Sequence, residues 1–211
     1  SMVQSILQNF GNEDQKNTFL PALASGSEIG AFALSESSSG SDATALKTTA
    51  KEDGDHFILN GSKLWITSAG VAKTYIVMAR TGKAGSKGVS AFILRDGDPG
   101  FSYGKTEKKM GWRTSPTREL LFENCKISKD RLLGKVGDGM KVALSALDAG
   151  RITIGAIAVG LSQRAVDESI SYSLTREQFQ QKIFDFQGLQ FMMADMDLET
   201  ESSRLLVYKE A

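Results

Sequence analysis

The spacing of apolar residues changes twice along the chain, and this change limits the folds that its 211 residues can adopt. Residues 2–25, and residues from about 140 onward, repeat apolar side chains at the 3.6-residue period of an amphipathic helix. Residues 29–133 instead alternate with period two, in short runs divided by glycine- and serine-rich turns. This order predicts helices, then an antiparallel β-sandwich or partly open barrel, then long helices.

Turn and cap signals refine this prediction. Asn12 is expected to cap the second helix, and Pro21 predicts a kink or a restart within it. A hairpin turn is expected at residues 53–55 and a second tight turn at Asn60-Gly61. A long helix is expected to end at about residue 174.

The end of the chain indicates a piece of a longer protein. The last helical pattern reaches Ala211 without a cap or a return element, and an apolar helix pair normally needs further helices to bury it. We therefore expect an α+β protein with a middle β-domain flanked by α-helices and followed by the start of a helical bundle. Its expected parts are the end of an N-terminal helical region at 1–28, the β-domain at 29–135 and a truncated helical domain at 136–211.

Composition argues against several classes of function. The chain has 25 basic and 25 acidic residues, so neither nucleic acid nor an anionic membrane is an expected partner. Cys125 is the only cysteine and is expected to be a packed, inert thiol in a reducing compartment. His56 is the only histidine, which leaves Ser-His-Asp or histidine–metal chemistry little to build on. No apolar run is expected to reach membrane-spanning length.

Two strand ends carry residues suited to a flat ligand. Residues 32–42 run from an apolar strand into a loop rich in hydroxyls and backbone N–H donors. After one hairpin, residues 64–68 end a second strand with an aromatic side chain beside two hydroxyls. Lying side by side, they would form a partly apolar slot edged by donors, which suits a planar heterocycle such as a flavin ring. Taken alone, however, Trp65 would be assigned to core packing on a sheet.

Five motifs in register resemble the acyl-CoA dehydrogenase family, and essentially the whole chain fits that pattern. The motifs are residues 32–42, Asn60-Gly61-Ser62-Lys63 leading into Trp65-Ile66-Thr67, Lys109-Met110-Gly111-Trp112-Arg113, Leu147-Asp148-Ala149-Gly150-Arg151, and Arg176-Glu177-Gln178-Phe179 followed by Gln187. The resemblance implies FAD as the cofactor and an acyl-CoA thioester as the substrate. The implied cofactor-binding residues are Phe32, Leu34, Ser35, Gly40, Ser41, Trp65, Ile66, Thr67, Arg176, Gln178, Phe179 and Gln187. The implied substrate-binding residues are Ser41, Ser86, Asp148 and Arg151, and no metal site is expected.

The resemblance also implies individual roles. Trp65 would lie against the isoalloxazine ring, and Thr67 would hydrogen-bond near its redox-active nitrogen. Asp148 and Arg151 would border the CoA chain, although a local helix salt bridge is an alternative for this pair. Arg176 would reach the pyrophosphate of a cofactor in a neighbouring subunit, which implies a homo-oligomer, either a dimer or a tetramer.

Three positions depart from the family pattern. Ser37-Ser38 replaces the usual Pro-Gly, which leaves that loop less constrained before folding. Gln180 replaces the usual Gly, so a turn that needs positive φ would be strained or reshaped. Gly150 stands where a minority of members carry the catalytic Glu on the long helix. We therefore expect the base beyond Ala211 and assign no catalytic residue within the chain.

The resemblance implies an oxidoreductase that desaturates an acyl-CoA at its α,β bond and passes electrons to an electron-transfer flavoprotein. Short or branched acyl chains are mildly favoured, as in fatty acid metabolism or branched-chain amino acid catabolism. The expected location is the cytoplasm of a bacterium or the mitochondrial matrix of a eukaryote. Two alternatives remain, namely another flavin enzyme of the superfamily, such as a monooxygenase or a nitroalkane oxidase, and a cofactor-free β-sandwich interaction module.

Overall fold

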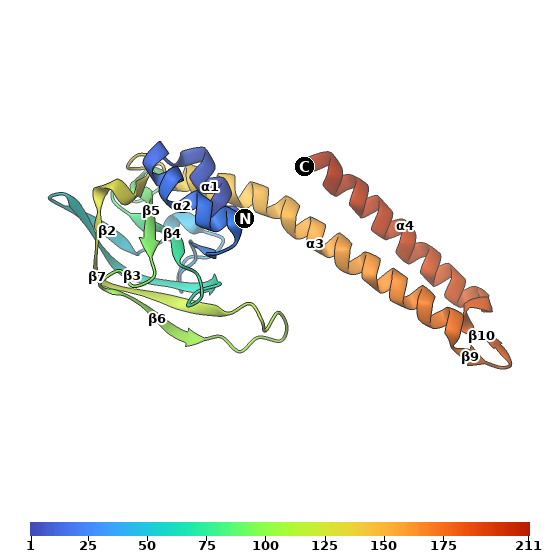
Figure 1. Ribbon diagram of the computed structural model, residues 1–211. Coiled ribbons are helices and arrows are strands. Elements are labelled where there is room, and N and C mark those ends of the chain that lie inside the picture. The colour runs from blue at the N-terminus through green and yellow to red at the C-terminus, as the bar shows by residue number, and fades with distance from the viewer. The chain divides into compact units, whose positions relative to one another are not determined.

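The computed structural model describes residues 1–211 and divides into two compact units, Ser1–Leu147 and Asp148–Ala211. The first unit contains α1 (Met2–Phe10), α2 (Glu13–Ser25), β1 (Gly30–Ala33), β2 (Thr49–Asp53), β3 (His56–Thr67), β4 (Thr74–Arg80), β5 (Val89–Arg95), β6 (Phe101–Thr106), β7 (Thr117–Ser128) and β8 (Leu132–Leu133). Helix α3 (Gly139–Thr175) crosses the division and is followed by β9 (Glu177–Gln178), β10 (Gln181–Lys182) and α4 (Gln187–Glu210) (Figure 1). The predicted α+β class, with a β-domain between helical parts, is confirmed.

The strands of the first unit form one eight-stranded sheet in the order β6-β7-β3-β2-β4-β5-β8, with β1 also paired to β4. Most neighbours are antiparallel, as predicted, but β1 and β2 both run parallel to β4. A parallel pair needs a long crossover between its strands. The chain supplies one because β3 lies between β2 and β4 in sequence, and β2 and β3 both lie between β1 and β4.

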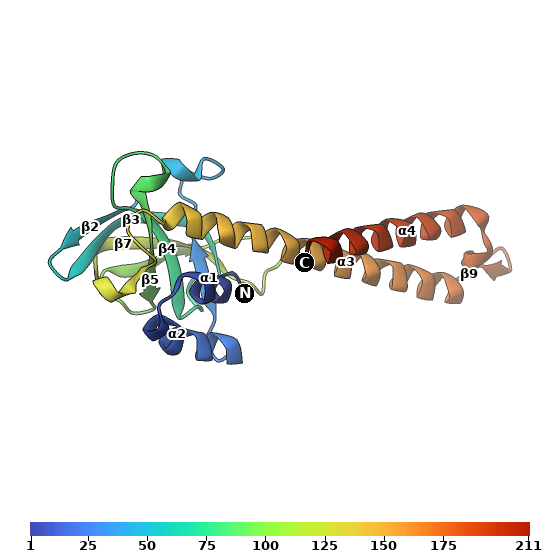
Figure 2. The same cartoon turned by 90° about the horizontal axis from the view of Figure 1, so that it is seen from above.

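Strand β4 is buried on both faces, which explains why helices accompany the sheet. Tyr75 and Val77 face one core, made by side chains of the curved sheet. Ile76 and Met78 alternate with them and face a second core with α1, α2 and the first turns of α3. Figure 2 shows α1 and α2 beside β4 and β5. The helices therefore cover an apolar sheet face that would otherwise meet water.

Two of the local features predicted from the sequence are confirmed, and a third is not. Asn12 caps α2 as predicted, accepting a hydrogen bond of 2.8 Å from the Gln15 N–H. The hairpin at residues 53–55 is also confirmed, since Asp53 pairs with His56 across the turn. The predicted restart at Pro21 was wrong, because α2 continues through it. Pro21 is exposed, so water can hydrate the carbonyl that its missing N–H leaves unpaired.

The predicted turn at Asn60-Gly61 was also wrong. Strand β3 continues through it, and the pairing with β7 shifts between Leu59 and Gly61. Gly61 has φ +137°, and a Cβ there would lie 2.8 Å from the Thr48 Cα. The extra residue of this bulge is on β7, so glycine at position 61 serves a strand opposite a bulge and a close approach to Thr48 rather than a chain reversal.

In the second unit, α3 and α4 are joined by the short β9–β10 hairpin (Figure 1). Val166, Met193 and Thr200 are buried between the helices, whereas Leu161 and Leu198 are more than half exposed. One 18-residue window of α3 has mean hydropathy 1.6, so the helix is long and apolar enough to cross a membrane by those criteria alone. The expectation that no apolar run reaches that length was therefore wrong, although core helices of soluble proteins meet the same criteria.

Candidate functional site

The first unit contains a hollow of about 400 Å³ where β1 and β3 end. Six of the predicted cofactor-binding residues line it, namely Phe32, Leu34, Ser35, Trp65, Ile66 and Thr67. The Leu64 N–H donates to the Ser35 carbonyl at 2.9 Å and ties the two segments together. The structure thus brings together the two strand ends that the sequence predicted to be neighbours.

Trp65 lies beside this hollow because β3 carries a bulge of its own. Lys63 pairs with Leu120 and Ile66 with Arg118, so β3 has one residue more than β7 over this stretch. Trp65 has φ +57° and is 62% exposed. A bulge redirects a side chain, and left-handed backbone costs a residue with a side chain roughly 1–2 kcal/mol. Core packing does not explain a strained and exposed tryptophan, so the geometry favours a ligand-facing role.

The Ser35 N–H is a free donor at the edge of the hollow. The Leu34 carbonyl of the same peptide accepts a hydrogen bond of 3.0 Å from the Lys63 ammonium. C=O and N–H point in opposite directions in a trans peptide, so the Ser35 N–H is directed away from Lys63. It donates to no acceptor in the protein. An electron-rich ligand atom in the hollow could therefore accept from it.

Lys63 and Glu36 form a buried ion pair of 2.7 Å behind this peptide, with side chains 0% and 6% exposed. The Glu36 carboxylate also accepts from the N–H groups of Lys47, at 2.6 Å, and Thr48, at 3.0 Å. Burial lowers the pKa of Lys63 to about 8, against the opposing effect of the Glu36 charge. Burial alone would raise the pKa of Glu36, but the Lys63 ammonium and the hydrogen bonds hold it below its usual value.

The loop after Glu36 closes tightly despite lacking Pro-Gly. Glu36 and Ser39 exchange two backbone hydrogen bonds of 2.8 and 3.2 Å across Ser37-Ser38. Gly40 and Ser41 follow on the exposed part of this loop and do not line the hollow. Ser86 lies on the β4–β5 connection, also exposed and outside the hollow. These three predicted residues are not gathered with the other six.

In the second unit, Asp148 and Arg151 line a separate hollow of about 510 Å³ between α3 and α4. Leu206 and Val207 contribute its apolar wall. No ion pair joins Asp148 to Arg151, so the local salt bridge considered for this pair is not formed. Both side chains are exposed and can face a ligand.

The connector between α3 and α4 carries the predicted residues Arg176, Gln178 and Phe179, and Gln187 begins α4; all four are exposed. Phe179 and Gln180 have φ +51° and +63°, between the paired residues Gln178 and Gln181. Both central residues of this two-residue turn are therefore left-handed, a conformation that usually selects Gly or Asn. Gln180 adopts the turn under strain, one of the two outcomes that the sequence predicted.

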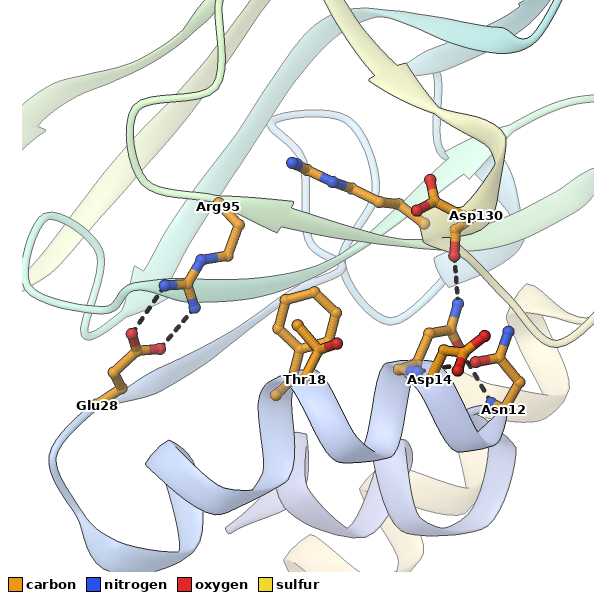
Figure 3. Close-up of a pocket in the computed structure, with 9 residues that line it drawn as sticks. Asn12, Asp14, Thr18, Glu28, Arg95 and Asp130 are labelled. Carbon is orange, nitrogen blue, oxygen red and sulfur yellow. Dashed lines mark hydrogen bonds and ion pairs between the residues drawn. The ribbon is translucent and has the colours of Figure 1, made fainter.

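Another hollow, of about 450 Å³, lies between α2, β5 and the β7–β8 connection (Figure 3). Its main charges are already paired, Arg95 with Glu28 and Arg131 with Asp98. The Gln15 amide donates to the Asp130 carbonyl at 2.7 Å. The hydrogen bond holds α2 to the β7–β8 connection, and the ion pairs hold segments beside it to the sheet, so we assign this region a structural role.

Two family models match the chain. The acyl-CoA dehydrogenase middle domain matches residues 31–125, and the acyl-CoA dehydrogenase C-terminal domain matches residues 137–211. The chain therefore belongs to the acyl-CoA dehydrogenase family.

Individual relatives agree with this assignment. Probable acyl-CoA dehydrogenase FadE25 of Mycobacterium tuberculosis is 50% identical over 95% of this chain and 52% of its own length. Butyryl-CoA dehydrogenase of Megasphaera elsdenii has a TM-score of 0.96 at 44% identity, over 99% of this chain and 55% of that one. A chain in the structure described as the electron transferring flavoprotein of Acidaminococcus fermentans has a TM-score of 0.96 at 50% identity, over 98% and 55%. An acyl-CoA dehydrogenase of Bacillus anthracis complexed with FAD has a TM-score of 0.88 at 41% identity, over 94% and 34%. The chain thus spans about half the length of the curated relatives it matches.

Lys63 and Glu36 lie within two of the motifs, but neither was among the residues predicted for the site. A signal was present for Lys63. It falls on the inward phase of β3, two residues beyond Gly61 and in step with the buried Phe57 and Leu59. A charged residue at an inward strand position requires a buried partner. No such signal identifies Glu36, because its partners lie 11 to 27 residues away in sequence.

Proposed function

We propose that this protein is an FAD-dependent acyl-CoA dehydrogenase that desaturates short-chain acyl-CoA thioesters at the α,β bond. The observation that carries the proposal is the hollow at the ends of β1 and β3, where a bulge places an exposed, strained Trp65 beside apolar and hydroxyl-bearing side chains. The short-chain preference is supported by the matched butyryl-CoA dehydrogenase.

The residues at the hollow fit a flavin ring. Trp65 and Ile66 offer flat and apolar surface, while the Ser35 N–H and the Thr67 hydroxyl offer hydrogen-bond donors at its edge. Bound FAD would supply the acceptor for the hydride that leaves the β-carbon. The protein groups would hold the ring, keep water from its apolar face and favour negative charge near the donors.

The reaction also requires a base for the α-proton of the thioester. Gly150 has no side chain and cannot act as one. We assign no base among the residues described above, and propose that the family's Glu supplies it from outside this chain.

Further parts of the proposal concern partners. Asp148 and Arg151 would contact the CoA portion of the substrate from the exposed hollow between α3 and α4. The exposed connector residues Arg176 and Phe179 would reach a cofactor in a second subunit, within a dimer or a tetramer. Electrons would pass to an electron-transfer flavoprotein, as the matched structure from Acidaminococcus fermentans suggests. The location would be the cytoplasm in a bacterium or the mitochondrial matrix in a eukaryote.

Anaerobic reduction of the bound flavin tests the proposal. The protein, expressed at its full encoded length and loaded with FAD, is mixed with butyryl-CoA, isobutyryl-CoA, octanoyl-CoA or a nitroalkane. Rapid loss of the oxidised flavin band with butyryl-CoA is expected, together with formation of the enoyl thioester. Bleaching by the nitroalkane alone would identify another flavin enzyme, and failure to bind FAD would favour a cofactor-free module.

A further inference from the structure

A completely buried lysine lies behind the candidate flavin site, and the function proposed above gives it no role. Lys63 is 0% exposed, whereas lysines are almost never fully buried unless paired. Replacing a buried ion pair by apolar residues of similar volume is often neutral or stabilising, so stability alone is weak evidence for the purpose of this pair. Its position, next to the bulge at Trp65, suggests another role.

The pair joins three parts of the chain, two of which contribute residues to the hollow. Lys63 belongs to β3, Glu36 follows β1, and the Glu36 carboxylate also accepts the N–H groups of Lys47 and Thr48 directly before β2. The Lys63 ammonium donates a second hydrogen bond, of 3.0 Å, to the Leu34 carbonyl. The path of the chain from Leu34 to Glu36 is therefore fixed from behind by charged groups.

This contact acts directly on the peptide whose N–H belongs to Ser35, a residue that lines the hollow. A positive charge on the Leu34 carbonyl draws electron density through the peptide and makes the Ser35 N–H on its opposite side a stronger donor. A ring that gains electrons gains negative charge, and a fixed donor stabilises the charged form more than the neutral one. The ammonium is thus in place to influence a bound ring through one peptide without contacting it.

We propose that Lys63 and Glu36 are positioning residues that orient and polarise the Leu34–Ser35 peptide and thereby raise the reduction potential of the flavin bound in the hollow. The inference rests on the proposed function, because it assumes that the hollow holds FAD. Glu36 keeps the ammonium in place, and Lys63 transmits its charge through the Leu34 carbonyl.

The test compares two variants with a matched control. K63M removes the ammonium and leaves the Glu36 charge unpaired, whereas K63M/E36M removes both charges but also takes away the acceptor of the Lys47 and Thr48 N–H groups. R131M breaks the Arg131–Asp98 pair, which is partly buried and does not line the hollow. Each protein is expressed at its full encoded length and loaded with FAD, and its flavin potential, visible spectrum and thermal unfolding are measured.

We expect both Lys63 variants to bind the reduced ring about tenfold more weakly relative to the oxidised ring, a fall of about 30 mV for a two-electron couple. K63M/E36M should recover part of the thermal stability that K63M loses, because no unpaired charge stays buried although the Lys47 and Thr48 N–H groups lose their acceptor, and it should keep the lowered potential. R131M should lose stability with an unchanged potential. A K63M/E36M protein with the wild-type potential would overturn the inference, and a wild-type protein that does not bind FAD would instead overturn the proposed function.

A measurement on the wild-type protein decides the matter where neither variant folds. Lys63 faces Glu36, with Arg80 as the neighbouring charge, and burial lowers its pKa to about 8. Its deprotonation should shift the absorption band of the bound flavin between pH 7 and about pH 9. A band that stays constant from pH 7 up to the pH at which the protein loses its fold or its flavin would refute the proposed link.

Discussion

Trp65 allows the ligand-facing and core-packing interpretations to be separated by two substitutions at one position. W65A removes the indole but keeps a Cβ at φ +57°, whereas W65G removes the indole and also relieves the left-handed backbone. If Trp65 packs a core, W65G should lower the free energy of unfolding strongly, whereas if Trp65 faces a ligand the loss should be small.

The exposure of Trp65 sets the magnitude. Truncating a fully buried tryptophan to alanine costs about 3–5 kcal/mol, and Trp65 is 62% exposed, so W65A should cost roughly 1–2 kcal/mol. W65G regains roughly 1–2 kcal/mol of steric strain and loses about 0.5–1 kcal/mol to the greater unfolded-state freedom of glycine. W65G should therefore be about 1 kcal/mol less stable than the wild type, about 2 kcal/mol at most, and at least as stable as W65A.

Urea denaturation of the apoprotein, followed by far-ultraviolet circular dichroism, measures these differences. L120A is the control, because Leu120 is 0% exposed and its truncation should cost about 2–5 kcal/mol. FAD titration of W65G should show about tenfold weaker binding, the loss of one aromatic contact with the ring. A loss of 3 kcal/mol or more in W65G would refute the reasoning and return Trp65 to the core.

Three further predictions concern the sheet and its buried groups. G61A should lower the free energy of unfolding by more than about 1 kcal/mol, because φ is +137° and the added Cβ would lie 2.8 Å from the Thr48 Cα; a neutral substitution in urea denaturation would contradict this. Burial raises the pKa of Cys125 to about 12, so a thiol reagent at pH 8 should label it in urea and leave the folded protein unlabelled, whereas rapid labelling of the folded protein would show an accessible thiol. The pKa of Glu36 is lowered from its ordinary 4.5, so its contribution to stability is present above that pH and lost as pH falls through the folded value. The stability difference between the wild type and E36Q should therefore shrink on acidification, and a difference that grows would refute the assigned direction.

Much of the fold could be predicted because it depends on neighbours in sequence. The Asn12 cap involves residues three apart, and the hairpin at residues 53–55 needs only a two-residue turn. The changes of period between helix and strand likewise repeat within short windows, so they give the α+β order and the extents of α3 and α4 closely. At the candidate site, the sequence indicated which two strand ends would meet.

Packing and register between distant strands decided the rest. Strand β3 meets β7 from fifty or more residues away in sequence, and their register places one bulge in β7, opposite Gly61, and another in β3, at Trp65. The same pairing turns Lys63 inward, where it meets Glu36, although the two residues are 27 positions apart. Composition and periodicity thus specified a sheet accompanied by helices. They also specified the two segments that could form a site for a planar ligand. Which side chains enter the hollow, and which charge stands behind it, depended on strand register, because one extra residue in a strand redirects every side chain after it.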